Sequence, residues 1–290
     1  VDLRPFRPAV GLGVLLEVRR DLLLGRLDRR HGGLQIEPHG IDRARLPGER
    51  LEPFRLGGQG EARVDDTDAE LVQRFHDVGT TVVAMVATLD DALAAVDNGA
   101  DVIVAQGTES GGHRSYGSKR DKHDAIGQST LTLVPLVIDQ VGDRVPVVAA
   151  GGIVDGRGLA AMLALGADGV LLGSRFVATR ESLASPVWKQ RMTTGDRSTT
   201  MTDGFTGQWA RVLTSEFTER WEESGAETPP GLMQSALGRD VFRSAAKVDD
   251  DQLRPLYAGS GIAAMDDIPG AGEVVARIVA QARERLQSSI

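Results

Sequence analysis

Short apolar runs alternate with amphipathic segments through the middle of the chain. Each apolar run is rich in β-branched residues and nearly continuous, as expected for a strand buried on both faces of a parallel sheet. Between these runs, residues 89–96 and 158–165 carry apolar side chains at helical spacing. Strands that alternate with single helices indicate βαβ units. The predicted strands are residues 81–88, 101–105, 145–150 and 169–172.

A short repeat favours one arrangement of these units. Gly99-Ala100-Asp101 recurs as Gly166-Ala167-Asp168, each time between a predicted helix and the next strand. Reuse of one unit favours a barrel over an open doubly wound sheet. The predicted fold class is therefore α/β, a (β/α)8 TIM-type barrel. Its second half is clear, whereas its first half is degenerate or incomplete, because too few βα units fit before residue 81.

The character of the sequence changes along the chain, which suggests three regions. Residues 1–75 form an atypical N-terminal segment that either completes the barrel or is degenerate or misread. Residues 76–182 plus 255–290 form the barrel portion, including an amphipathic helix over 274–286 that we expect on the barrel exterior. Residues 183–254 form a helical cap insertion. Its tryptophans are more typical of a core or an interface than of a substrate site; they are Trp188, Trp209 and Trp221.

Composition excludes several classes of protein. The formal charge of −8 over 290 residues argues against general binding to nucleic acid or to an anionic membrane. No apolar run is long enough to span a bilayer. The chain has no cysteine, so disulfides and thiolate metal sites are excluded, and no spacing predicts another metal site. The first residues show no secretory signal, so we expect a cytoplasmic protein. A homodimer is left open.

Candidate chemistry lies in glycine-containing loops that follow the predicted strands. Glycine lets backbone N–H groups approach a ligand closely, which suits a phosphate-bearing cofactor. His113 lies in the first loop and is a candidate proton acceptor; plain turns and a solvated histidine are the alternatives. Glu109 is more typical of a loop charge than of a second acid, and Tyr257 is a further candidate lining residue. The loops are residues 106–113, Gly151-Gly152 and Gly173-Ser174.

These motifs together resemble the nitronate monooxygenase family, formerly called 2-nitropropane dioxygenases. The resemblance covers roughly residues 75–287 and implies an FMN-dependent (β/α)8 barrel. No single motif is specific, but the combination is. The matching stretches are residues 99–113, 133–137, 145–158, 166–179, 257–262 and 267–269.

The resemblance implies a role for each matching position. Gln106 corresponds to a polar contact to the flavin, and Gly111 to the glycine that lets the loop lie against the cofactor. His113 corresponds to the catalytic histidine, which takes a proton from a neutral nitroalkane or positions the anionic nitronate. The positions that correspond to the FMN-phosphate cradle are Gly151, Gly152, Leu171, Leu172, Gly173 and Ser174.

The function implied is oxidation of alkyl nitronates, and of nitroalkanes, by O2 to carbonyl compounds and nitrite. An FMN-dependent enoyl-acyl-carrier-protein reductase is an alternative, because it shares the barrel and much of the histidine loop. Position 106 carries glutamine rather than an acidic residue, and this choice favours the monooxygenase over the reductase. The family's N-terminal flavin contacts have no counterpart in residues 1–75. This difference motivates a third interpretation, a non-catalytic truncated flavin-binding remnant.

Overall fold

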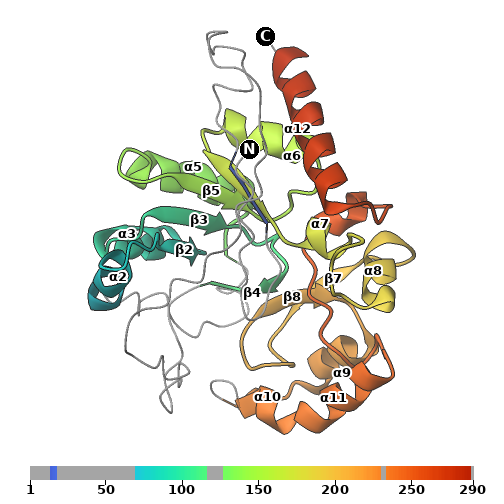
Figure 1. The fold of residues 1–290 in the computed structure, drawn as a ribbon. Coiled ribbons are helices and arrows are strands. Elements are labelled where there is room, and N and C mark those ends of the chain that lie inside the picture. Colours follow the sequence, from blue (N-terminus) through green and yellow to red (C-terminus); the bar gives the residue numbers. More distant parts are fainter. Residues whose placement is uncertain (1–13, 18–68, 116–126, 230–232, 289–290) are drawn as a thin grey trace.

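A computed structural model describes residues 14–17, 69–115, 127–229 and 233–288 (Figure 1). Most of the N-terminal segment 1–75 lies outside these ranges, so its relation to the barrel stays a prediction. Among the described residues, no helix combines the length and the apolar character needed to cross a bilayer.

A parallel sheet with one antiparallel edge strand organises the described chain. β2 (Val83–Val86), β3 (Val102–Gln106), β5 (Val147–Ala150) and β6 (Gly169–Leu172) pair in parallel, in the order β6-β5-β3-β2. The connecting helices are α3 (Leu89–Asp97), α5 (Thr130–Val141) and α6 (Gly156–Ala164). The predicted strands and βαβ units are confirmed. β1 (Val14–Glu17) pairs with β6 antiparallel, which differs from the all-parallel pattern of a (β/α)8 barrel.

The two faces of this sheet carry different residues because side chains alternate along each strand. One face packs against the helices and forms the main core, with Ile103, Ala149 and Leu172 among its fully buried members. The opposite face carries a smaller cluster that includes Val104 and Val148. A barrel strand likewise has one face toward the helices and one toward the interior.

The repeated Gly-Ala-Asp segments form the same hinge twice. The glycine has a positive φ in both, 96° at Gly99 and 101° at Gly166, where L side chains are strained. In each hinge the aspartate carboxylate accepts a hydrogen bond from a backbone N–H at, or one residue before, the start of the preceding strand. These bonds run from Val82 N–H to Asp101 Oδ2 (2.7 Å) and from Val147 N–H to Asp168 Oδ2 (2.8 Å).

The segment predicted as a helical cap contains strands as well as helices. Its helices are α8 (Pro186–Thr193), α9 (Glu216–Ser224), α10 (Met233–Leu237) and α11 (Arg239–Lys247). β7 (Thr199–Thr202) and β8 (Ala210–Leu213) form an antiparallel pair, and β4 (Gly112–His113) adds to β8. A loop of the barrel portion thus supplies a strand to the cap sheet. The boundaries at 183 and 254 stay a prediction.

Aromatic side chains form the core of the cap. The rings of Phe205 and Phe217 stack with centroids 4.4 Å apart, and Trp221 stacks on Phe217 at 6.1 Å. Trp188 packs against a second buried cluster that includes Met192 and Leu256. Trp188 and Trp221 therefore serve packing, in line with the sequence interpretation.

The C-terminal helix α12 (Ala271–Ser288) packs against α6, on the helix side of the sheet (Figure 1). Gly156, at the start of α6, allows this close contact. A Cβ there would lie 2.3 Å from Gln281 Cβ and 2.5 Å from Ile278 O, both on α12. Gly156 N–H also donates to Gln281 Oε1 at 3.0 Å.

We predict that Gly156→Ala lowers the free energy of unfolding by about 1–3 kcal/mol, because the added methyl group forces the helices apart. Gly272→Ala is the matched control, since a Cβ there meets nothing within 4 Å. Urea denaturation followed by circular dichroism measures both. Equal stability of the two variants would contradict this account of the α6–α12 contact.

Candidate functional site

Several loops meet at the carboxyl ends of β3, β5 and β6. The strand registers align these ends: Gln106 lies beside Ala150, and Ala150 lies beside Leu171. The turns that follow therefore leave the same edge of the sheet. Gly152 and Gly173 are exposed there. The structure thus brings together the glycine turns that the sequence predicts as one site.

Direct contacts hold these loops to one another and to residues 258–261. Gly259 N–H donates to Ser174 Oγ at 2.8 Å, and Ser260 N–H donates to Glu109 O at 3.0 Å. Gly107 N–H donates to Ala150 O at 2.9 Å. Four segments that are far apart in sequence therefore form one cluster at this edge.

Two of the predicted glycines make room for the protein itself. A Cβ on Gly111 would lie 2.5 Å from Gly259 N. A Cβ on Gly151, where φ is 113°, would lie 2.6 Å from Ser110 Oγ. Both side-chain positions are therefore filled by neighbouring loops, and the missing side chains let these loops pack closely.

Gln106 braces the loop that carries His113. It lies at the end of β3, on the sheet face opposite the helices, and is 4% exposed. Its Nε2 donates to His113 O at 2.9 Å, and its Oε1 accepts from Ser115 N–H at 2.9 Å. Contact of this side chain with a flavin stays a prediction.

His113 lies between the barrel portion and the cap. Its backbone pairs with Ala210 in β8, and its Nε2 lies 2.9 Å from Thr206 Oγ1. The ring of Tyr257 lies beside the imidazole, with centroids 5.3 Å apart. Burial lowers the pKa of His113 below its ordinary value of 6.5. The imidazole is therefore neutral at neutral pH and able to accept a proton.

Tyr257 stays protonated at neutral pH, because burial raises the pKa of its phenol to about 12. Its ring lies beside that of His113, and its place in the lining of a ligand site stays a prediction. Its neighbour Leu256 accepts a backbone hydrogen bond from Leu213 in β8. This contact ties the segment before the 258–261 turn to the cap sheet.

Glu109 has a structural role. Its Oε2 accepts from Thr130 N–H at 2.8 Å and from Thr130 Oγ1 at 2.9 Å, at the start of α5. A carboxylate at a helix N-terminus satisfies free N–H groups and interacts well with the helix dipole. This position explains Glu109 without a role in acid–base chemistry.

Leu171 and Leu172, both predicted in the cradle, face opposite ways. Leu172 is 1% exposed and belongs to the core beneath the helices. Leu171 packs against the small cluster on the other face and is partly exposed. A ligand at the strand ends could therefore meet the side chain of Leu171, but only the backbone of Leu172.

Sequence reasoning missed Thr206 and Arg211, which both contact the candidate site. Thr206 is the hydrogen-bond partner of the His113 ring. Arg211, in β8, donates from Nε to Thr108 O at 2.9 Å. Neither residue belongs to a motif, and both reach the site through the pairing of β4 with β8. No signal within the sequence identifies them.

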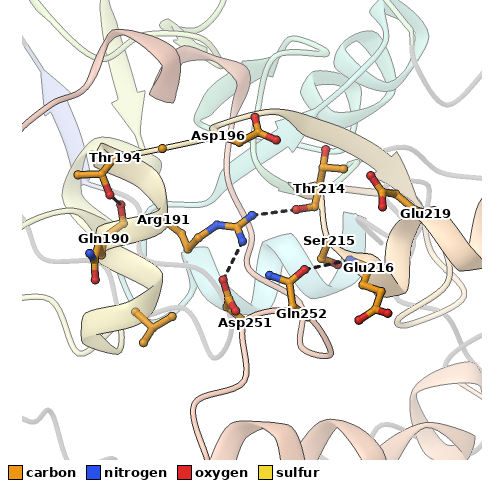
Figure 2. A pocket seen from close by; sticks show the side chains of 12 residues that line it. Gln190, Arg191, Thr194, Asp196, Thr214, Ser215, Glu216, Glu219, Asp251 and Gln252 are labelled. Carbon is orange, nitrogen blue, oxygen red and sulfur yellow. Dashed lines mark hydrogen bonds and ion pairs between the residues drawn. The ribbon is translucent and has the colours of Figure 1, made fainter.

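A cleft of about 460 Å³ lies apart from these loops, between α8 and α9 (Figure 2). Arg191 in this cleft donates to Asp251 Oδ2 at 2.7 Å and to the backbone oxygen of Thr214 at 2.9 Å. None of the predicted site residues lines it. Across the described ranges, no three carboxylate or histidine side chains are grouped as metal ligands.

The chain is similar to known proteins over most of its length. A family model described as nitronate monooxygenase matches residues 62–281. The chain belongs to the nitronate monooxygenase family. A probable nitronate monooxygenase from Staphylococcus haemolyticus (strain JCSC1435) is 34% identical over 66% of this chain. Another, from Staphylococcus aureus (strain MSSA476), is 31% identical over 75% of it. The chain covers 53% and 60% of the lengths of these relatives.

Solved structures of the family's fold agree with this assignment. A nitroalkane oxidase from Streptomyces ansochromogenes has a TM-score of 0.71 and 34% identity, over 77% of this chain and 63% of that chain. FabK from Thermotoga maritima has a TM-score of 0.65 and 31% identity, over 76% and 66%. These likenesses confirm the predicted (β/α) TIM-type barrel, of which the described strands form part.

We predict that acid destabilises the protein partly through His113. Because its pKa is lower in the folded state, the unfolded chain alone takes up this proton as the pH falls below 6.5. Stability contributed by the neutral imidazole is therefore present above this pH and lost below it. The free energy of unfolding should fall less between about pH 7 and pH 5 in His113→Gln than in the wild type. Parallel curves for the two proteins would contradict the burial of this ring.

Proposed function

We propose that this chain is a flavin-dependent oxidoreductase that uses FMN and O2 to convert alkyl nitronates, and neutral nitroalkanes, to carbonyl compounds and nitrite. The observation that carries the proposal is the meeting of the Gly152 and Gly173 turns at adjacent strand ends, beside the loop of His113. Membership of the nitronate monooxygenase family supports the reaction class. The chain spans 53% and 60% of the length of the two curated relatives.

The exposed glycine turns suit the phosphate of FMN. Without side chains, Gly152 and Gly173 leave their main chain accessible, and α7 (Ser174–Val177) begins directly after Gly173. In TIM-type barrels the loops after the last two strands commonly bind phosphate in this way. Ser174 Oγ accepts a hydrogen bond from Gly259 N–H, its one bond to the described residues. Its hydroxyl proton is therefore free to be donated to a phosphate oxygen.

The flavin ring is proposed to lie toward the sheet face that carries Gln106 and Leu171. Leu171 offers an apolar, partly exposed side chain, and Gln106 holds the His113 loop in place from the same face. When bound, FMN supplies the electron transfer between the substrate and O2. The residues around it bind and orient the substrate and exclude water.

His113 is the proposed general base for neutral nitroalkanes. It is uncharged at neutral pH because of its burial, and it sits at the carboxyl-end loops where the substrate would bind. Tyr257 closes one side of the imidazole and remains protonated. With a nitronate substrate, no proton needs to be removed, and His113 serves only to position the anion.

The structural likeness to FabK keeps the enoyl-acyl-carrier-protein reductase as the second candidate. Reduction of a crotonyl thioester by NADH, without nitrite release from a nitronate, would favour it. A chain that stays colourless between 350 and 500 nm after incubation with FMN would instead support the non-catalytic remnant.

We predict that Gly173→Asp weakens FMN binding by about tenfold or more, because the carboxylate repels the phosphate. Gly173 is exposed and has a φ of −98°, a negative value that L residues adopt. The fold is therefore expected to persist. Riboflavin, which has no phosphate, should bind this variant as it binds the wild type. Quenching of flavin fluorescence measures both affinities.

Gly272→Asp provides the charge-matched control, because this glycine lies in α12 with open space around it. It should leave the affinities for FMN and riboflavin unchanged. Equal weakening of both ligands by Gly173→Asp, or no effect on either, would exclude Gly173 from the phosphate cradle.

We predict that His113→Ala retains FMN but loses about 10²–10⁴-fold in kcat on neutral nitroalkanes, as expected for removal of a positioned base. Turnover of the corresponding nitronate should fall much less, since it needs no deprotonation. Nitrite release measures both rates. Unchanged turnover of the neutral nitroalkane would refute the assignment of the base.

A further inference from the structure

The two ring nitrogens of His113 have different surroundings. Nε2 lies 2.9 Å from Thr206 Oγ1. Over the part of the chain that the structure describes, Nδ1 has no hydrogen-bond partner. A neutral imidazole carries one N–H and one lone pair, so its two tautomers differ in which nitrogen can accept a proton.

The surroundings of Thr206 favour one of these tautomers. Its hydroxyl has one proton and two lone pairs. Gln208 O lies 3.3 Å from Thr206 Oγ1 and accepts its proton, while Gln208 N–H approaches the same atom at 3.4 Å. The remaining lone pair of Oγ1 can accept a hydrogen bond from an N–H at Nε2. The opposite tautomer would set the lone pair of Nε2 against a hydroxyl whose proton is directed to Gln208 O, and would place an N–H at Nδ1, which has no acceptor among the described residues.

The loop that carries Thr206 is held firmly by the cap. Asp203 O accepts from Thr206 N–H (3.2 Å) and from Gly207 N–H (2.7 Å) in a tight turn. The Asp203 carboxylate accepts from Trp221 Nε1 at 3.2 Å and from Thr228 Oγ1 at 2.7 Å. The next residue before Thr206 is Phe205, 4% exposed within the aromatic core. The hydroxyl is therefore placed by cap packing before any substrate arrives.

We propose that Thr206 is a positioning residue that fixes the tautomer of His113, with Nε2–H donated to Thr206 Oγ1 and the lone pair of Nδ1 left as the proton acceptor. This inference rests on the proposed function for its consequence in catalysis, although the tautomer itself is a property of the free protein. Because Thr206 belongs to the cap, the cap then takes part in the proton transfer by His113 in the barrel loop.

Proton transfer from a neutral nitroalkane to His113 breaks one bond and forms another. The C–H bond beside the nitro group breaks, its proton forms an N–H bond at Nδ1, and the electron pair stays on the substrate as the nitronate. His113 becomes an imidazolium whose Nε2–H remains on Thr206 Oγ1. No proton has to leave Nε2 during the step, so the hydrogen bond from Nε2–H to Thr206 Oγ1 is kept throughout.

Long-range ¹H–¹⁵N spectra of the full chain with ¹⁵N-labelled histidine test the proposal above the pKa of His113. His113→Gln identifies the signals. The wild type should show a protonated Nε2 and an unprotonated Nδ1. Thr206→Ser retains the hydroxyl and should keep this pattern, whereas Thr206→Val should shift the tautomer ratio toward Nδ1–H. Thr193→Val is the control, since it removes another buried cap hydroxyl, bonded to Lys189 O in α8.

A wild-type spectrum with the proton on Nδ1 would overturn the proposal, and so would an unchanged ratio in folded Thr206→Val. Should that variant not fold, the wild-type and Thr206→Ser spectra still decide the assignment. These spectra need neither flavin nor turnover. A failure of the tautomer assignment is therefore distinct from a failure of the proposed function, which would appear as absence of nitrite.

In turnover, Thr206→Val should lower kcat for neutral nitroalkanes more than it changes KM, and Thr206→Ser should restore kcat. A merely structural role for Thr206 would instead lower turnover of the neutral nitroalkane and of its nitronate alike. That result would overturn the catalytic part of the proposal.

Discussion

Main-chain pairing between β5 and β6 sets the geometry on which the candidate site depends. With Ala150 beside Leu171 in parallel register, the turns that follow the two strands leave the sheet at one edge. A register shift of one residue would reverse the faces of every side chain and separate Gly152 from Gly173. The Gly-Ala-Asp hinge helps to fix this register, because Asp168 bonds to the backbone of Val147 at the start of β5. Local backbone chemistry and the proposed phosphate site are therefore linked through a few hydrogen bonds.

A second pairing couples the barrel portion to the cap. β4 is short, yet it places His113 in the cap sheet beside Ala210 and within reach of Thr206. Gln106 secures the same loop from the barrel side. The imidazole is thus held by two parts of the molecule with separate hydrophobic cores. Loops on a rigid scaffold commonly carry catalytic groups in this way, and here Thr206 of the cap also forms a hydrogen bond with the ring.

Sequence reasoning predicted the elements whose signals are local. Continuous apolar runs indicated the parallel strands, and the repeated hinge could be read because only glycine adopts its backbone conformation readily. The roles of Thr206 and Arg211 could not be predicted, because they arise from a strand pairing across about a hundred residues. The strands β7 and β8 were missed for a related reason: short strands owe their stability to tertiary pairing more than to propensity. Gly111 was predicted to let its loop lie against the cofactor, which stays a prediction; the structure shows that its missing side chain makes room for Gly259.

The central claim is that the amides after β5 and β6 bind the phosphate of FMN. The most direct measurement compares backbone ¹H–¹⁵N spectra of the chain with FMN and with riboflavin. The account predicts that FMN shifts the amide signals of Gly152, Gly173 and Ser174, and that riboflavin leaves these three nearly unchanged. Binding of FMN that shifts other amides while these stay fixed would contradict it.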